Sequence, residues 1–147
     1  TRLVDMGVEP VLVASTVEAV MAQRLVRRLC PHCKRPVQLR ADDVPTDFPL
    51  DKVSPEGLFE PVGCRTCRQI GYSGRMGIYE LMVTTDDVRQ LAHDRASSWK
   101  VKQAAMRQGM QTLRQDGWNK VLAGSTTIEE IARVTKGDRE LSMSDSR

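Results

Sequence analysis

Cys30-Pro31-His32-Cys33 and Cys64-Arg65-Thr66-Cys67 are the two stretches that decide the fold of this 147-residue chain. Each is a C-x-x-C knuckle, in which two sulfurs share one tight turn and backbone N–H groups can point at the thiolates. The two knuckles use all four cysteines of the sequence. Four thiolates match the tetrahedral coordination of Zn²⁺ and leave no position open for water. The sequence therefore predicts a structural zinc site, which performs no chemistry, with the ligands Cys30, Cys33, Cys64 and Cys67.

The spacing of the knuckles departs from the usual pattern in one respect. Thirty residues separate Cys33 from Cys64, whereas about 15–20 are typical of this arrangement. A longer loop gains more from being closed by a metal ion. With four cysteines present, we interpret His32 as an exposed bystander rather than a ligand, although it could replace a cysteine. His93, at a predicted helix end, supplies at most a favourable charge there.

Three other uses of the cysteines are less well supported. Disulfides fit poorly, because the first residues show no secretory signal and thiols stay reduced in the cytoplasm. A thioredoxin-like redox site needs one reactive C-x-x-C rather than two matched ones. Four unrelated buried thiols would be a coincidence.

Composition and charge set broad limits on the function. The net charge is +3, and apolar residues make up 40% of the chain but aromatic residues only 4%. A charge this small does not by itself imply binding to nucleic acid or membranes. No apolar run approaches the about 20 residues needed to cross a bilayer. We expect a cytoplasmic location and, because the chain starts at Thr1 rather than Met, a longer parent protein.

The N-terminal part, residues 1–29, is predicted to contain a strand followed by a helix. The apolar run at residues 11–14 indicates a buried strand. Ser15 and Glu18 have capping-box spacing, so a helix is expected to begin at about Thr16. One apolar face of that helix would carry Val17, Val20, Met21, Leu25 and Leu29.

The middle of the chain changes in composition. Residues 30–75 contain six of the seven prolines and show little periodicity, which indicates a loop-rich module that needs a metal ion to stabilise it. Residues 76–83 mix β-branched and aromatic residues and predict a short strand. Its apolar side chains fall on both faces, so both faces are expected to be covered.

The last part, residues 84–135, is predicted to be helical and to form a small helical bundle. Residues 136–147 are polar and are expected to be a flexible tail. The predicted N-terminal caps are Thr85, Ser97 or Ser98, Thr112 and Thr127, with Gly109 and Gly124 closing the second and third helix.

Several catalytic motifs are missing. The sequence has no G-x-x-x-x-G-K-[ST] phosphate loop, no H-E-x-x-H and no G-x-S-x-G. We interpret the glycine-rich residues 71–75 as a tight turn. We interpret the basic residues at positions 24–35 as a solvated face or a subunit interface. Nucleic-acid binding is disfavoured, because aromatic residues are not interleaved with them and the net charge is small.

Six stretches, in order along nearly the whole chain, resemble the GspE/PilB family of type II secretion and type IV pilus assembly ATPases. The tetracysteine insertion is specific to assembly-type members, and retraction-type relatives generally lack it. The stretches are residues 12–17, 22–33 (AQRLVRRLCPHC), 63–67, 71–81 (GYSGRMGIYEL), 110–118 and 127–135.

The resemblance implies a hexameric RecA-like motor that hydrolyses ATP with Mg²⁺ and drives pilin-like subunits through a membrane platform protein. The parent would lie at the inner membrane through platform and cytoplasmic-domain partners. The Walker A and B segments would precede Thr1, so this chain would hold no catalytic residue and be inactive alone. Arg75 would lie near the bound nucleotide; otherwise it forms a salt bridge, for example to Glu80.

The resemblance also implies a division of this α+β chain. Residues 1–29 would be the final strand and helix of the RecA-like ATPase domain, and residues 30–75 the zinc-binding module. Residues 76–135 would be a strand plus a C-terminal helical subdomain, followed by the flexible tail at 136–147.

Two functions of other classes remain as alternatives. A stand-alone zinc-ribbon module would bind nucleic acid or protein, and its nucleic-acid binding would depend on salt. A redox protein would have reactive thiols without bound metal.

Overall fold

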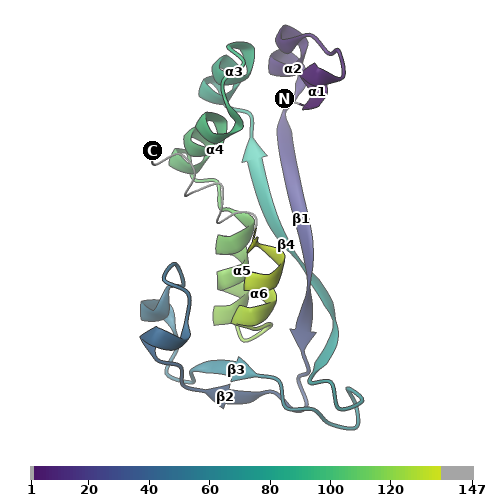
Figure 1. The fold of residues 1–147 in the computed structure, drawn as a ribbon, viewed down its shortest axis with the longest axis vertical. Coiled ribbons are helices and arrows are strands. Elements are labelled where there is room, and N and C mark those ends of the chain that lie inside the picture. The colour runs from purple at the N-terminus through teal and green to yellow at the C-terminus, as the bar shows by residue number, and fades with distance from the viewer. Residues whose placement is uncertain (1, 137–147) are drawn as a thin grey trace. The chain divides into compact units, whose positions relative to one another are not determined.

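The structure, a computed structural model, describes residues 2–136 and contains both helices and antiparallel strands (Figure 1). The α+β class is as the sequence predicted. The described residues divide into two compact units, unit 1 with residues 2–22 and 80–112, and unit 2 with residues 23–79 and 113–136. The predicted tail lies outside the described residues except for Lys136.

Two pairs of strands form the sheets. Strands β1 (Ala19–Leu29) and β4 (Tyr72–Val83) form one two-stranded sheet and run side by side in Figure 1. Each of them passes from one unit into the other. Strands β2 (Arg35–Val37) and β3 (Leu58–Glu60) pair antiparallel within unit 2, with Val37 opposite Leu58.

The predicted strand at residues 11–14 is wrong. These residues belong to helix α2 (Pro10–Thr16), which follows the short helix α1 (Arg2–Asp5). Pro10 occupies the start of α2, where its fixed φ suits a helix and its missing N–H costs nothing. The helix packs against α3 (Asp86–His93), and the Arg89 guanidinium donates to the Ala14 carbonyl at 2.6 Å.

The predicted helix from Thr16 to Leu29 is also wrong, because these residues enter strand β1. The hydroxyl of Ser15 donates to the Leu12 carbonyl inside α2 and caps no following helix. Strand β1 buries Val26 and Leu29, while Met21 on the expected apolar face is 62% exposed. Pairing with β4, more than forty positions later in the sequence, outweighs the local helical periodicity.

Strand β4 confirms the predicted strand at 76–83 and extends it backwards to Tyr72. The expectation that both of its faces are covered is wrong for the described residues. Ile78 is completely buried, but Leu81 and Val83 are 51% and 58% exposed. In the two-stranded β1–β4 sheet, only the face that other elements of the chain pack against is buried.

Unit 1 contains the helices α3 and α4 (Ser98–Arg107), both as predicted. The Ser97 hydroxyl caps α4 by accepting from the Lys100 N–H, whereas Thr85 bonds Gln108 instead of capping α3. The unit has a small aliphatic core made of Val88, Ala104 and Ala105, with Met82, Leu91, Val101 and Met110 packed against it.

Unit 2 contains helices α5 (Leu113–Leu122) and α6 (Ile128–Val134), which also confirm predicted helices. The Thr127 hydroxyl caps α6 by accepting from the Glu130 N–H. Residues 38–57 carry only two short 3₁₀ turns, η1 (Ala41–Asp43) and η2 (Leu50–Lys52). The four helices of the predicted bundle therefore fall into two pairs, one in each unit.

Gly117 sets how closely α5 approaches α6. A Cβ atom at this position would lie 2.6 Å from Cγ2 of Ile131, which is completely buried. We expect Gly117→Ala to lower the free energy of unfolding by about 1–3 kcal/mol through overpacking, despite the better helix propensity of Ala.

Urea denaturation of a double-mutant cycle tests this contact. Ile131→Ala shortens the side chain that the new methyl group would meet. In the Ile131→Ala background, Gly117→Ala should therefore lower the free energy of unfolding by less than it does in the wild type. Strictly additive effects would contradict a steric origin.

Candidate metal centre

The four cysteines come together in unit 2, as the sequence predicted. Their Sγ atoms all lie within 4.8 Å of one another. The Sγ–Sγ separations are 3.9 Å for Cys30–Cys64, 3.8 Å for Cys33–Cys67 and 3.7 Å for Cys64–Cys67. Cys30 and Cys67 are buried, and none of the four forms a disulfide. One thiol of each knuckle therefore faces inwards.

These separations suit a tetrahedral metal ion. Sulfurs at about 2.3 Å from a central Zn²⁺ lie about 3.8 Å apart along the edges of a tetrahedron. Three of the six separations, at 3.7–3.9 Å, agree with that edge length, and all six lie within 4.8 Å. A disulfide needs about 2.05 Å between sulfurs. The arrangement can hold one metal ion with four thiolate ligands.

Backbone conformation shapes the second knuckle. Gly63 and Gly71 flank it with φ angles of +112° and +79°, in the left-handed region that favours glycine. A Cβ on Gly71 would lie 2.5 Å from Cβ of Pro61. Both glycines also donate backbone N–H bonds to sulfur, from Gly63 to Cys33 and from Gly71 to Cys67, each at 3.3 Å. The glycines thus permit the turn and orient two of the sulfurs.

The thiols differ in their electrostatic surroundings. Burial raises the pKa of Cys33 to about 11, against the opposing effect of the Gly63 N–H. Burial would also raise the pKa of Cys67, but the N–H groups of Cys64 and Gly71 lower it to about 6. Donors aimed at sulfur favour the thiolate, which is the form that binds metal.

Two other predicted residues lie outside the cluster. His32 is exposed and is not among the residues that converge, which agrees with its interpretation as a bystander. Arg75 is exposed on strand β4. Glu80, its suggested salt-bridge partner, forms an ion pair with Lys102 at 3.4 Å. A nucleotide contact by Arg75 stays a prediction.

The long loop between the knuckles is anchored to α5, which sequence reasoning missed. The Asp47 carboxylate accepts from Arg114 Nε at 2.5 Å and Nη2 at 2.9 Å, and from Trp118 Nε1 at 3.0 Å. The adjacent Phe48 ring packs edge-on against Trp118, with 5.3 Å between centroids. The hydrogen bond from Arg114 is the main cause that lowers the pKa of Asp47. This contact ties the loop to the helical part of unit 2.

We expect Asp47→Ala to lower the free energy of unfolding by about 1–3 kcal/mol, because it leaves N–H groups of the buried Arg114 and Trp118 without their acceptor. Asp51→Ala, at an exposed position in the same loop, is the matched control and should change stability little. Urea denaturation of both variants measures the difference; equal effects would contradict the anchoring role.

A second connection joins strand β1, just before the first knuckle, to helix α6. The buried Glu130 carboxylate accepts from Arg27 N at 2.9 Å, Nε at 3.0 Å and Nη2 at 2.7 Å. Arg133 Nη2 donates to the same carboxylate at 2.9 Å. The Arg27 guanidinium also lies over the Tyr72 ring of β4, 4.1 Å from its centroid. The capping-box spacing at Thr127 identified the helix start but not this use of Glu130.

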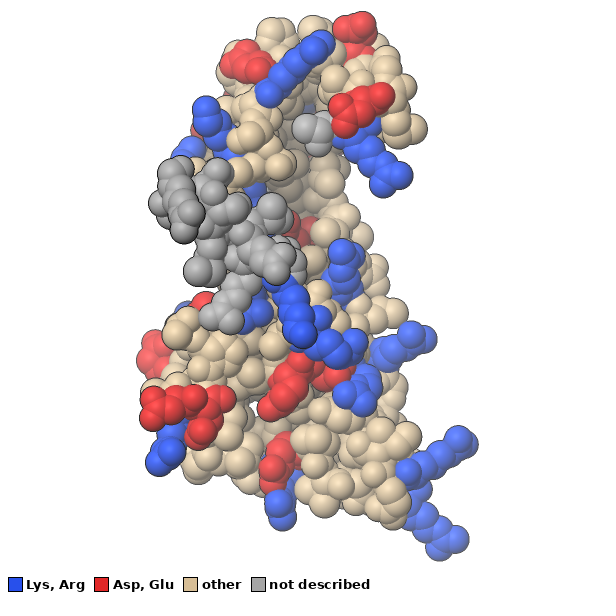
Figure 2. Space-filling model, viewed as in Figure 1, with Lys and Arg blue, Asp and Glu red and all other residues tan. Residues whose placement is uncertain are grey.

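Surface charge is mixed in sign. Figure 2 shows Lys and Arg interspersed with Asp and Glu on the displayed face, in keeping with the net charge of +3. The described residues on this face form no one-signed stripe of the kind typical of nucleic-acid binding proteins. Among residues 2–136, none of the helices has the length and apolar character needed to cross a bilayer.

Comparison with known proteins gives consistent matches. Type II secretion system protein HxcR of Pseudomonas aeruginosa is 46% identical over 136 residues, which cover 92% of this chain and 25% of HxcR. Type IV pilus assembly ATPase PilB of Myxococcus xanthus is 43% identical, over 95% of this chain and 25% of PilB. Type II secretion system ATPase E of Vibrio cholerae is 41% identical, over 92% of this chain and 27% of that protein.

The chain thus spans about a quarter of the length of these curated relatives. The model of the family described as "Type II/IV secretion system protein" matches residues 1–133, which is nearly the whole chain. From this match, together with identities above 40% to proteins named for type II secretion and type IV pilus assembly, the chain is a member of the type II/IV secretion system protein family.

Proposed function

We propose that this chain is the C-terminal part of a hexameric, RecA-like ATPase that powers assembly of a type II secretion pseudopilus or a type IV pilus. The observation that carries the proposal is the family match over residues 1–133, with relatives named as ATPases of both machines. The full-length protein would hydrolyse ATP with Mg²⁺ in the cytoplasm, at the inner membrane through platform and cytoplasmic-domain partners.

Within that motor, this chain would supply a structural zinc site and contacts to other subunits or to the platform. Cys30, Cys33, Cys64 and Cys67 would hold the zinc ion. A site with four protein ligands has no position for substrate or water, so its contribution is folding energy rather than chemistry. The Asp47 and Glu130 contacts would extend the effect of the metal to helices α5 and α6.

The test is to purify the full-length protein under reducing conditions and measure ATP hydrolysis with and without Mg²⁺, molar mass by light scattering, and bound zinc. We expect Mg²⁺-dependent hydrolysis, a hexamer and one zinc ion per chain, whereas the 147-residue chain alone should hydrolyse no ATP. A folded, zinc-loaded full-length protein without ATPase activity would overturn the motor assignment and leave the metal site standing.

Arg75 allows a finer test of the nucleotide site. If its exposed guanidinium lies near bound nucleotide in the full-length enzyme, Arg75→Ala should raise KM for ATP by about two- to fivefold, as expected for an exposed charge contact. Arg65→Ala, at an exposed position in the second knuckle, is the control and should leave KM unchanged. Equal kinetics of both variants and the wild type would remove Arg75 from the nucleotide site.

A further inference from the structure

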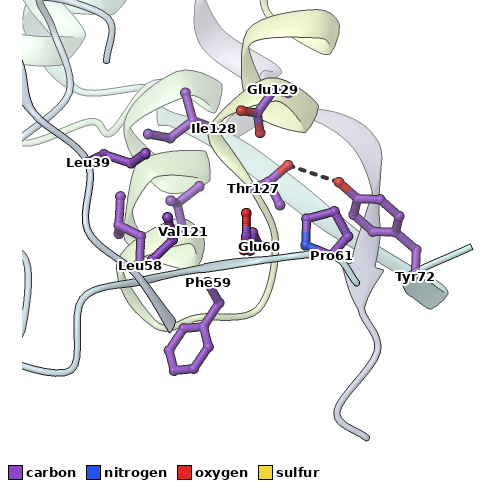
Figure 3. Close-up of a pocket in the computed structure, with 11 residues that line it drawn as sticks. Leu39, Leu58, Phe59, Glu60, Pro61, Tyr72, Val121, Thr127, Ile128 and Glu129 are labelled. Carbon is purple, nitrogen blue, oxygen red and sulfur yellow. Dashed lines mark hydrogen bonds between the residues drawn. The ribbon is translucent and has the colours of Figure 1, made fainter. Parts of the chain in front are cut away.

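Unit 2 carries a cavity of about 340 Å³ that the metal site does not use (Figure 3). It lies where strand β3 faces helices α5 and α6, and we call it the β3–α6 groove. Its lining comes from the end of β2 and the loop after it, from β3 and the residue that follows it, from the start of β4, and from the two helices with the N-cap of α6. Its apolar lining includes Leu39, Leu58, Val121 and Ile128, and the carboxylates of Glu60 and Glu129 lie among the lining residues as well.

The floor of the β3–α6 groove is apolar and fixed in place. Leu58, Val121 and Ile128 are at most 7% exposed and belong to the core of the unit. Leu39 is half-buried at the edge of the cavity. Because core side chains hold the floor, the groove exists before anything binds to it, which lowers the cost of binding.

Polar groups on the rim are paired, with one exception. Tyr72 and Thr127 form a hydrogen bond of 3.2 Å between their hydroxyls, marked in Figure 3. Glu60 accepts from Arg35 Nε at 2.5 Å. Glu129 is exposed, and no hydrogen bond or ion pair joins its side chain to any residue in the part of the chain that the structure describes. Its neighbour Glu130, in contrast, turns inwards to Arg27 and Arg133.

We propose that the β3–α6 groove binds an extended segment of a partner protein that presents a leucine-sized apolar side chain beside a lysine or arginine. A cavity of this volume is at the lower end of the range for ligand sites and suits one side chain with its adjoining backbone. An apolar anchor in a preformed pocket is the usual centre of a protein interface. The exposed Glu129 carboxylate, unpaired among residues 2–136, complements a basic neighbour and selects against acidic segments.

This site goes beyond the proposed motor function and does not depend on it. None of the cysteines lines the groove, so binding there can be tested separately from zinc binding and ATP hydrolysis.

The test uses the zinc-loaded 147-residue chain and three synthetic seven-residue peptides with glycine and serine at both ends. Their central residues are arginine–leucine–arginine, arginine–glycine–arginine and glutamate–leucine–glutamate. Titration followed by methyl NMR of Val121 and Ile128 reports both affinity and position. We expect the first peptide to bind at least tenfold more tightly than the second, because only the first buries an apolar side chain. The first peptide should also bind at least about threefold more tightly than the third, because only the first places basic residues near Glu129.

Charge reversal on the rim sharpens the test. Glu129→Lys should weaken binding of the arginine–leucine–arginine peptide and strengthen that of the glutamate–leucine–glutamate peptide, each by threefold or more. Glu56→Lys is the matched control, since Glu56 is an exposed acid of the same unit that does not line the groove. Leu39→Ser should weaken both leucine-containing peptides and leave their charge preference intact.

Three results would overturn the proposal. The first is equal binding of all three peptides, or no shift of the groove methyl groups at millimolar concentration. The second is an unchanged preference in Glu129→Lys. The third is self-association of the chain, seen by light scattering and abolished by Glu129→Lys, because the occupant would then be a second copy.

Discussion

Cys67→Ser is expected to abolish zinc binding and to cause the largest loss of stability of any single substitution considered for this chain. The wild-type chain should carry one zinc ion, because its four Sγ atoms converge within 4.8 Å and three of their separations match a tetrahedral site. Zinc bound by four thiolates contributes about 10 kcal/mol or more to the folding of small zinc domains. Loss of one ligand should therefore lower the free energy of unfolding by several kcal/mol.

Zinc content by elemental analysis and thermal melting of the same samples measure both effects. Chelation of the wild-type chain should bring its melting temperature down to that of Cys67→Ser, and chelation should then have no effect on the variant. His32→Ala, within a knuckle but outside the cluster, should keep full zinc content and wild-type melting.

Two outcomes would contradict the metal site. One is a wild-type chain that folds and melts normally with four free thiols and no zinc, which would favour the redox alternative. The other is a Cys67→Ser variant that is destabilised although the wild type never contained metal, which would make Cys67 a packing residue only.

Glu130→Gln is expected to have the second largest effect, about 3 kcal/mol at pH 7. The carboxylate is buried, yet hydrogen bonds from Arg27 and Arg133 outweigh the cost of burial and lower the pKa of Glu130 from 4.5 to about 2. A pKa lowered in the folded state stabilises the protein above the unfolded pKa, and a difference of 2.5 units corresponds to about 3 kcal/mol. Gln cannot carry the charge that both arginines need.

The pH dependence follows from the same shift. The stabilising effect of Glu130 is complete above about pH 5 and decreases as the pH falls through 4.5 towards 2. We expect the difference in free energy of unfolding between wild type and Glu130→Gln to shrink by about 2 kcal/mol between pH 7 and pH 3. Any loss of metal at acidic pH lowers the free energy of unfolding of both proteins alike, since both have the same cysteines. The difference between the two proteins at each pH therefore does not contain this effect.

Glu129→Gln is the natural control, because the adjacent carboxylate is exposed. It should leave the free energy of unfolding within about 0.5 kcal/mol of wild type at every pH. A stability difference for Glu130→Gln that stays constant from pH 7 to pH 3 would show that shape rather than charge explains the loss.

Much of the metal site could be predicted from residue types and spacing alone. The two C-x-x-C motifs determine which sulfurs lie on the same turn, because three residues of backbone suffice to bring them together. Helix starts at Ser97 and Thr127 were predictable for the same reason, since a cap needs only the next turn of the chain. Gly63 and Gly71 could have been found as positions that need a left-handed backbone beside a knuckle.

Tertiary structure alone decided the N-terminal elements. The apolar residues of 17–29 recur at helical intervals, and a single sequence cannot show that Tyr72–Val83 will pair with them. Backbone hydrogen bonds to a distant strand outweigh propensities that differ by less than about 1 kcal/mol per residue. The carboxylate of Glu130 illustrates the same limit, because its partner Arg27 lies 103 positions away. What this sequence determined by itself is the local geometry of knuckles and helix caps, whereas contacts between distant segments exist only once the chain has folded.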